Sequence, residues 1–346
     1  MDSSQVSLRE AVLWEPLGED KKVNCRLCNW RCNINDGKLG RCFVRQNISG
    51  TLYSLNYYKV ISANPDPIEK KPLFHFQPGS RSFSIAAMGC NFQCEFCQNW
   101  QISQTPADGG EIDGQAITPE QIVAAAKRSG CKSIAYTYTE PTIFMELCSE
   151  CGKLAKENGL ANVFVSNGFM TTEAIDFVSG WLDGINIDLK AFNEEFYRRL
   201  CKGRLQPVLD TISYIAKETN IWMELTTLLI PDENDSDEEL KQLADFIVNN
   251  AGPDVPWHIS RFHPQYKYLD SVPTPTGSLK KAYDIGKSTG LNYIYIGNVP
   301  GSKQENTYCY NCKRLLIGRI GYRISVNNIK DGKCPDCSAK IAGFKL

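Results

Sequence analysis

Three closely spaced cysteines are the residues in this chain that most clearly imply chemistry. Cys90, Cys94 and Cys97 form a C-x3-C-x2-C run directly after residues 83–87, which read as a short buried strand. Three thiolates on one irregular loop can bind three irons of a cubane cluster, whereas clusters that only carry electrons normally have four. We therefore expect one iron to be open to a small ligand, as in a catalytic metal site. The alternatives are a zinc site or an inert cysteine-rich loop.

The other cysteines also fall into groups with the spacing of metal ligands. The chain has 15 cysteines, of which only Cys131, Cys148, Cys151 and Cys201 stand outside the groups. Grouping of this kind in a reducing compartment indicates metal binding more than disulfides. The two outer groups comprise Cys25, Cys28, Cys32 and Cys42, and Cys309, Cys312, Cys334 and Cys337.

Composition is ordinary for a globular protein of 346 residues, with 42% hydrophobic and 22% charged residues. The net charge of −1 gives no electrostatic sign of nucleic-acid or membrane binding. Residues 1–5 lack the features of a signal peptide, and we find no apolar run of membrane-spanning length. These features predict a cytoplasmic protein with no nucleic-acid or membrane partner.

Strand-like and helix-like segments alternate from residue 83 to residue 298, which predicts an α/β fold with a parallel sheet closed into a partial (β/α)6-type barrel. Helix starts are expected at Thr118, Thr171 and Ser236, the first and last with a capping box. Residues 1–82 and 299–346 read as small cysteine-rich modules that use metal to compensate for thin cores. The expected strands are residues 83–87, 133–136, 162–165, 184–189, 222–229, 257–260 and 293–296.

Polar residues follow several of these strands, at the sheet edge where loops converge and active sites form. Glu140 follows the second strand, and alternation places Asp188 and Lys190 on one face after the fourth. A helix-start carboxylate and a buried ion pair are the structural alternatives. The further candidates for cofactor binding are Tyr138, Thr139, Ser166, Asn167, Ile230, Arg261 and His263, whereas His258 is as well explained as a barrel histidine.

The three-cysteine run, with Phe96 before the third cysteine, resembles the signature of radical SAM enzymes. The resemblance implies that S-adenosylmethionine chelates the open iron and that one electron cleaves it to a 5′-deoxyadenosyl radical. It also implies that Glu140 binds the cofactor's amino group, although Tyr138 and Thr139 stand where many members have two glycines. A reductant such as flavodoxin or ferredoxin is implied as a partner.

The chain as a whole is similar to pyruvate formate-lyase activating enzymes, and more so to the radical SAM proteins of the AmmeMemoRadiSam system. The segments that carry this resemblance are residues 25–28, 66–75, 94–104 and 256–264. Activation of a glycyl-radical enzyme is therefore one hypothesis, and radical modification of a small molecule or of a residue in a partner protein is the second. A non-catalytic electron carrier or scaffold is the alternative from another class.

The outer cysteine groups suggest different metals. Two C-x2-C knuckles near the C-terminus, separated by a strand hairpin around residues 318–324, predict a zinc-ribbon or rubredoxin-like site, with zinc favoured over a single iron. The N-terminal group fits zinc or a second [4Fe-4S] cluster equally, and a cluster there would suit an electron relay. Cys148 and Cys151 are expected to be packing thiols.

Overall fold

The computed structural model describes residues 8–18, 20–299 and 301–346. Residues 1–5, which bear on the signal-peptide prediction, lie outside the described residues. The fold is α/β, as predicted, and contains two compact units. The first comprises residues 1–66, 82–93 and 97–183, and the second comprises residues 67–81, 94–96 and 184–346.

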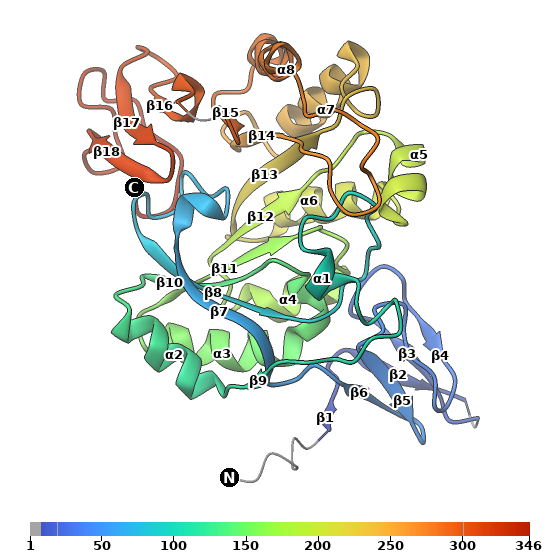
Figure 1. The fold of residues 1–346 in the computed structure, drawn as a ribbon. Helices are drawn as coiled ribbons and strands as arrows, with labels where there is room; N and C mark the ends of the chain where they lie inside the picture. The colour runs from blue at the N-terminus through green and yellow to red at the C-terminus, as the bar shows by residue number, and fades with distance from the viewer. Residues whose placement is uncertain (1–7, 19, 300) are drawn as a thin grey trace. The chain divides into compact units, whose positions relative to one another are not determined.

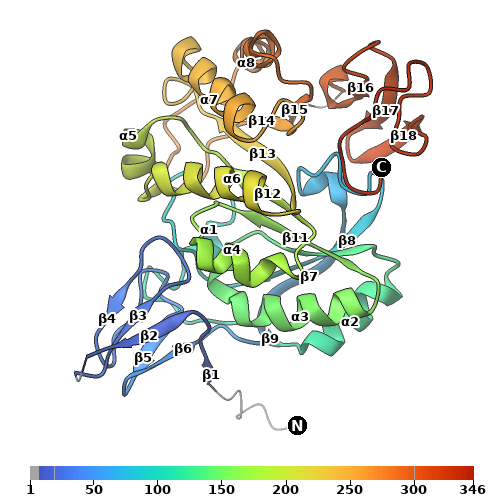
Figure 2. The same ribbon diagram turned by 180° about the vertical axis from the view of Figure 1, so that it is seen from behind.

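Strands of the first unit run in the order β9, β7, β8, β10, β11 (Figure 1). β10 pairs in parallel with both β8 and β11, so that Ser133 lies between Ser82 and Ala161. Helices α2, α3 and α4 lie on the side of these strands that faces the viewer in Figure 2. The bounds are β7 Lys59–Pro67, β8 Arg81–Ala87, β9 Gln115–Ala116, β10 Ser133–Tyr136, β11 Ala161–Ser166, α1 Trp100–Ser103, α2 Pro119–Arg128, α3 Met145–Glu157 and α4 Thr172–Ser179.

Two small antiparallel sheets form the N-terminal part of the first unit. Their strand orders are β1-β6-β5 and β2-β3-β4. The second sheet places Cys25 opposite Trp14 at the end of a strand. The bounds are β1 Arg9–Glu10, β2 Trp14–Leu17, β3 Lys22–Cys25, β4 Asn33–Ile34, β5 Arg45–Ile48 and β6 Thr51–Ser54.

The second unit repeats the parallel strand-helix pattern with strands β12, β13, β14 and β15. A separate antiparallel sheet, β16-β17-β18, follows at the C-terminus (Figure 1). Short helical turns complete both units: η1 Ile68–Lys70, η2 Pro141–Phe144, η3 Tyr197–Cys201 and η4 Lys303–Glu305. The remaining bounds are β12 Gly184–Asp188, β13 Trp222–Leu229, β14 Trp257–Arg261, β15 Ile294–Gly297, β16 Thr307–Tyr308, β17 Leu315–Ile320, β18 Arg323–Asn327, α5 Glu194–Phe196, α6 Gln206–Glu218, α7 Asp237–Asn250 and α8 Thr276–Thr289.

Helix starts agree with the sequence except in one detail. Thr118 and Gln121 form a reciprocal capping box on α2, and Thr171 caps α4 through the Ala174 N–H group. Ser236 caps α7, but its predicted capping box is wrong. The Glu239 carboxylate instead accepts a hydrogen bond from the Phe192 N–H group at 2.8 Å, because a tertiary partner replaces the local one.

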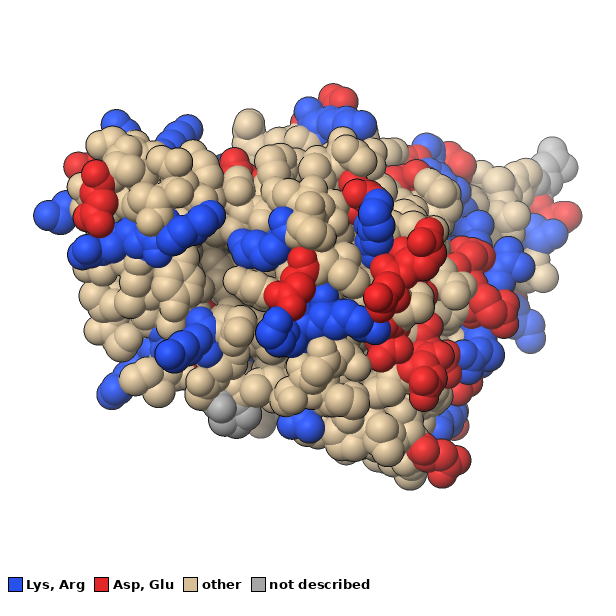
Figure 3. Space-filling model, turned by 90° about the horizontal axis from the view of Figure 1, so that it is seen from above, with Lys and Arg blue, Asp and Glu red and all other residues tan. Residues whose placement is uncertain are grey.

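The strand interiors are apolar and closed to solvent. Ile85, Ile134 and Val163, on adjacent strands of the first unit, are fully buried. A core cluster in the second unit joins Phe74 and Tyr295 to side chains of the C-terminal sheet. In the part of the chain that the structure describes, every helix is too short or too polar to cross a bilayer. Basic and acidic side chains are both present on the face in Figure 3.

Candidate functional site

The three-cysteine loop begins at a glycine that no other residue could replace without strain. Gly89 has φ +105°, and a Cβ atom there would lie 2.6 Å from Val44 Cγ1 and 3.3 Å from the carbonyl oxygen of Cys42. In the loop the Phe92 N–H group lies 3.4 Å from Cys90 Sγ. The backbone therefore turns sharply just before the first expected cluster ligand.

The predicted polar segment after β10 turns back immediately. Tyr138 has φ +67°, a region that favours glycine. Its hydroxyl donates a hydrogen bond to the Asp66 carboxylate, and Thr139 Oγ1 donates one to the Ala87 carbonyl oxygen at 2.7 Å. These contacts hold a tyrosine and a threonine in the turn where many radical SAM enzymes have two glycines.

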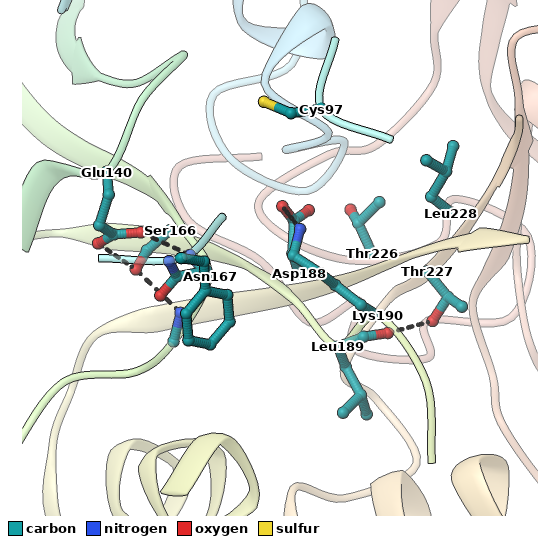
Figure 4. A network of polar contacts seen from close by, with 12 residues as sticks. Cys97, Glu140, Ser166, Asn167, Asp188, Leu189, Lys190, Thr226, Thr227 and Leu228 are labelled. Atoms are coloured by element: carbon teal, nitrogen blue, oxygen red, sulfur yellow. Dashed lines mark hydrogen bonds and ion pairs between the residues drawn. The ribbon is translucent and has the colours of Figure 1, made fainter. Parts of the chain in front are cut away.

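Glu140 is fully buried and is surrounded by donors from its own chain. One carboxylate oxygen accepts hydrogen bonds from Thr142 Oγ1 at 2.5 Å and Ser166 Oγ at 2.9 Å, and the other accepts one from the Asn167 N–H group at 2.8 Å (Figure 4). Burial nevertheless raises the pKa of Glu140. Both oxygens thus connect Glu140 to neighbouring residues, including the end of β11.

Asn167 continues this network to the three-cysteine loop. Its side-chain nitrogen donates a hydrogen bond to Asn91 Oδ1 at 2.6 Å and lies 3.8 Å from Cys90 Sγ. The Asn91 side-chain nitrogen is buried and has no hydrogen-bond partner among the described residues. A donor is therefore left over beside Cys90, where a bound group with acceptor atoms would satisfy it.

Asp188 and Lys190 form the ion pair that strand alternation predicted, with 2.7 Å between Oδ2 and Nζ. β12 ends at Asp188, and Thr227 Oγ1 then holds the carbonyl oxygen of Leu189 at 2.8 Å (Figure 4). The Asp188 side chain is 36% exposed. A buried structural pair is therefore a poor description, because this carboxylate remains open to a ligand.

Lys190 also influences Cys94, which lies in the same unit. Burial opposes the Lys190 charge, but Asp188 and Cys94 attract it and leave the pKa of Lys190 well above its usual range. A hydrogen bond from the Cys201 thiol lowers the pKa of the Cys94 thiol, and the Lys190 charge adds to this. Cys94 is thereby prepared to act as a thiolate ligand.

The remaining candidates have mixed environments. Phe96 is buried against Phe196, with 5.8 Å between ring centroids. Ile230 is fully buried, Arg261 Nε donates to the Thr274 carbonyl oxygen at 2.9 Å, and His263 is exposed. These positions give His263 access to a ligand, whereas Ile230 presents no surface.

The alternative reading of His258 as a barrel histidine is confirmed. His258 is buried, and its Nε2 lies 2.7 Å from Glu224 Oε2. Glu224 is fully buried and also accepts hydrogen bonds from the N–H groups of Phe74 and His75. These contacts account for His258 without a ligand.

The C-terminal cysteines form a compact four-sulfur group. Cys309 Sγ lies 3.6 Å from Cys337 Sγ, and Cys312 Sγ lies 3.5 Å from Cys334 Sγ. All four sulfurs lie within 4.8 Å of one another, and β17 and β18 form the predicted hairpin between the knuckles. This is a metal-binding group whose geometry suits one tetrahedral ion.

The sequence did not predict two of these contacts. Asn91 stands directly after a cluster cysteine, and its polar side chain was the available signal. Cys201 has no nearby cysteine in the sequence, so its contact with Cys94 depends on the fold. The packing role predicted for Cys148 and Cys151 is supported, because both are fully buried on α3.

Comparisons with known proteins concern the family and the fold of the chain. The model of the radical SAM superfamily matches residues 85–247. The chain is 45% identical to the uncharacterized protein MJ0808 of Methanocaldococcus jannaschii over 96% of this chain and 99% of that one. It is 30% identical to a putative glycyl-radical enzyme activating enzyme, MJ1632, of the same organism, over 60% of this chain and 77% of that one.

Among solved structures, a radical SAM methyltransferase from Sphaerobacter thermophilus has a similar fold, with a TM-score of 0.50 and 17% identity. The match covers 64% of this chain and 67% of that one. The residues matched by the superfamily model include all three loop cysteines and the strand ends with Glu140, Asn167 and Asp188. The chain belongs to the radical SAM superfamily.

Proposed function

We propose that this protein cleaves S-adenosylmethionine at a [4Fe-4S] cluster bound by Cys90, Cys94 and Cys97, and that the resulting radical removes a hydrogen atom from glycine in a partner enzyme. The observation that carries the proposal is the hydrogen-bonded connection from Glu140 through Asn167 to Cys90. Structural roles alone do not require a buried carboxylate to position a side chain against a cysteine of this loop.

The residues present fit the cluster. The Cys94 thiol has a lowered pKa, and the sharp turn at Gly89 frees the following residues from sheet pairing. Asn91 retains a buried donor beside Cys90. Thiolates, donors to sulfur and an irregular loop are the features by which proteins hold and tune such clusters.

In this family the cluster supplies one electron, and S-adenosylmethionine supplies the 5′-deoxyadenosyl radical. The chain's own residues bind and orient. We expect the Asp188 carboxylate and the Lys190 ammonium to face the polar groups of the cofactor, with Lys190 charged throughout the physiological pH range. Glu140 keeps Ser166 and Asn167 in place, and binding of the cofactor's amino group by Glu140 stays part of the proposal.

The identity of the substrate is supported by likeness to MJ1632, described as a putative glycyl-radical enzyme activating enzyme. A one-electron donor such as flavodoxin or ferredoxin would reduce the cluster. We retain S-adenosylmethionine contacts for Phe96, Tyr138, Thr139, Arg261 and His263 as part of the proposal, and zinc as the metal of the C-terminal group.

The test uses anaerobically reconstituted full-length protein, a chemical reductant and S-adenosylmethionine. We expect 5′-deoxyadenosine from the wild type, none from Cys94→Ala, and wild-type amounts from Cys131→Ala, which lies outside the three cysteine groups. Loss of product with an intact cluster in the wild type would overturn cofactor cleavage.

The substrate needs a separate readout. A purified glycyl-radical enzyme added to the active mixture should develop the electron paramagnetic resonance doublet of a glycyl radical. Formation of 5′-deoxyadenosine without a protein radical across such partners would instead favour a small-molecule substrate.

A further inference from the structure

We propose that Cys25, Cys28, Cys32 and Cys42 bind a second [4Fe-4S] cluster and not a zinc ion. These four cysteines, here called the head site, lie in the first unit and are all described by the structure. The inference goes beyond the proposed function, because S-adenosylmethionine cleavage requires only the cluster on the Cys90 loop.

The distance between the sulfur atoms differs between a site for one zinc ion and a site for a [4Fe-4S] cluster. Four thiolates at about 2.3 Å from one tetrahedral zinc ion lie about 3.8 Å apart. The C-terminal group shows this spacing, with S–S distances of 3.5 and 3.6 Å. Among the described residues, the head-site cysteines do not form a compact group of this kind.

The head-site cysteines are nonetheless neighbours in the fold. The Cys25 N–H group donates to the Cys32 carbonyl oxygen at 2.9 Å, and a Cβ atom on Gly40, two residues before Cys42, would lie 4.0 Å from Cys32 Sγ. The four cysteines therefore belong to one packed segment without forming the compact group that a single ion requires. A cubane requires this arrangement, because each of its thiolates binds a different iron.

One head-site sulfur has a buried cationic donor. Arg45 Nη1 lies 3.9 Å from Cys25 Sγ. Donors of this kind stabilise thiolates and raise the reduction potential of a cluster.

The cation beside the head site is held rigidly. Arg45 is 1% exposed, forms an ion pair with the buried Glu146 of α3, and donates to the Val12 carbonyl oxygen at 3.0 Å. A buried cation needs such partners, and its position beside Cys25 favours negative charge at the site. Neutral thiols alone would gain little from this cation.

The head site lies against the loop of the first cluster. A Cβ on Gly89 would lie 3.3 Å from the Cys42 carbonyl oxygen, and Trp30 Nε1 donates to the Asn91 carbonyl oxygen at 2.8 Å. Cys28 also forms a β-bridge with Met170. The ligand loop is thus fixed to its surroundings as part of a packed segment.

The test removes the first cluster and measures what remains. Full-length protein with Cys90→Ala, Cys94→Ala and Cys97→Ala is reconstituted without oxygen using ferrous iron and sulfide, in the presence of zinc. We expect about four irons and about four sulfides per chain, as one remaining cubane requires. The reduced variant should give an electron paramagnetic resonance signal that S-adenosylmethionine does not change.

Zinc without iron, about two irons, or no metal at the head site of the folded triple variant would overturn the proposal.

Should that variant fail to fold, the comparison is made with Cys28→Ser in the otherwise native chain. This variant should lose about half of the wild-type iron and keep a signal that S-adenosylmethionine alters, and an unchanged iron content would overturn the proposal. Cys131→Ser is the matched control and should keep all of the iron. If the wild type forms no 5′-deoxyadenosine, that result counts against the proposed function. The iron measurement would still test the second cluster.

Discussion

The Asn167 side-chain nitrogen reaches the first cysteine of the three-cysteine loop, lying 3.8 Å from Cys90 Sγ while it donates to Asn91 Oδ1 at 2.6 Å. A strand end of the first unit is thereby tied to the place where we expect the cluster. We predict that Asn167→Asp lowers the midpoint potential of the cluster, because an anion replaces a donor beside a ligand sulfur.

A redox titration followed by electron paramagnetic resonance measures this potential. Asn158→Asp, the same change at an exposed residue after α3, serves as the control and should leave the potential unchanged. An Asn167→Asp potential equal to that of the wild type would contradict the contact between Asn167 and the cluster ligand.

Glu140 yields a prediction about stability and its dependence on pH. In Glu140→Gln the side-chain NH2 group, itself a donor, must face a group that donates to the carboxylate in the wild type. We therefore expect a loss of about 1–3 kcal/mol in the free energy of unfolding. Because burial raises the pKa of Glu140, the wild type loses stability as pH rises from the ordinary value of 4.5 through the raised folded-state value. The difference in the free energy of unfolding between the wild type and Glu140→Gln should therefore be larger at low pH and become smaller as pH increases.

Urea denaturation at several pH values across this range checks both effects. Glu157→Gln, on an exposed position of α3, should change the free energy of unfolding by no more than about 0.5 kcal/mol at each pH. A gap for Glu140→Gln that widens with increasing pH would show that the carboxylate is stabilised as an anion, contrary to this account.

The strand pattern was largely predictable from the sequence, because buried parallel strands are short apolar runs bounded by turn residues. β10 and β13 have the predicted bounds, and the other parallel strands differ by one or two residues at one or both ends. Long-range contacts were not predictable in this way. Glu239 reaches Phe192 and not its own N-cap, and Arg45 pairs with Glu146 across the first unit, because tertiary partners decide where buried polar groups are satisfied.

The same limit applies to the candidate site. Asp188 and Lys190 were placed together by strand alternation, and the structure pairs them. The hydrogen bonds that Glu140 accepts from Thr142, Ser166 and the Asn167 N–H group could not be predicted, and binding of the cofactor by Glu140 stays a prediction. Local sequence predicts which polar residues stand at the strand ends, but it does not reveal which hydrogen-bond partners the folded chain gives them.

Tyr138 tests how much strain the turn after β10 holds. Its φ of +67° favours glycine, and Tyr138→Ala and Tyr138→Gly both remove the ring and the hydrogen bond to Asp66. We expect the glycine variant to be more stable than the alanine variant by up to about 1 kcal/mol, because only glycine adopts this conformation freely. Thermal unfolding of the two variants side by side provides the measurement, and greater stability of the alanine variant would contradict the left-handed conformation.

Cys201 is expected to tune the cluster through Cys94. Replacement by alanine removes the thiol that donates to the Cys94 sulfur, so the cluster should become harder to reduce. Cys148→Ala, at a buried cysteine on α3, is the matched control for loss of a buried thiol. A midpoint potential that falls in Cys201→Ala but not in Cys148→Ala supports the hydrogen bond, and equal potentials in both variants would refute it.

The C-terminal four-sulfur group should stabilise the sheet β16-β17-β18 through its metal. Cys312 is exposed and Cys337 is partly exposed, so replacing both by serine removes two ligands with little loss of packing. We expect the double variant to lose one zinc per chain and to melt about 10 °C lower or more, since structural zinc contributes directly to folding. The control is Asp336→Asn, an exposed change between Cys334 and Cys337, which should retain the metal.

Because Cys309 and Cys334 are buried beside Phe74 and Leu316, loss of the ion should also loosen this core, which hydrogen exchange of β17 would detect. An unchanged metal content or melting temperature in the double variant would mean that the four sulfurs do not hold a structural ion.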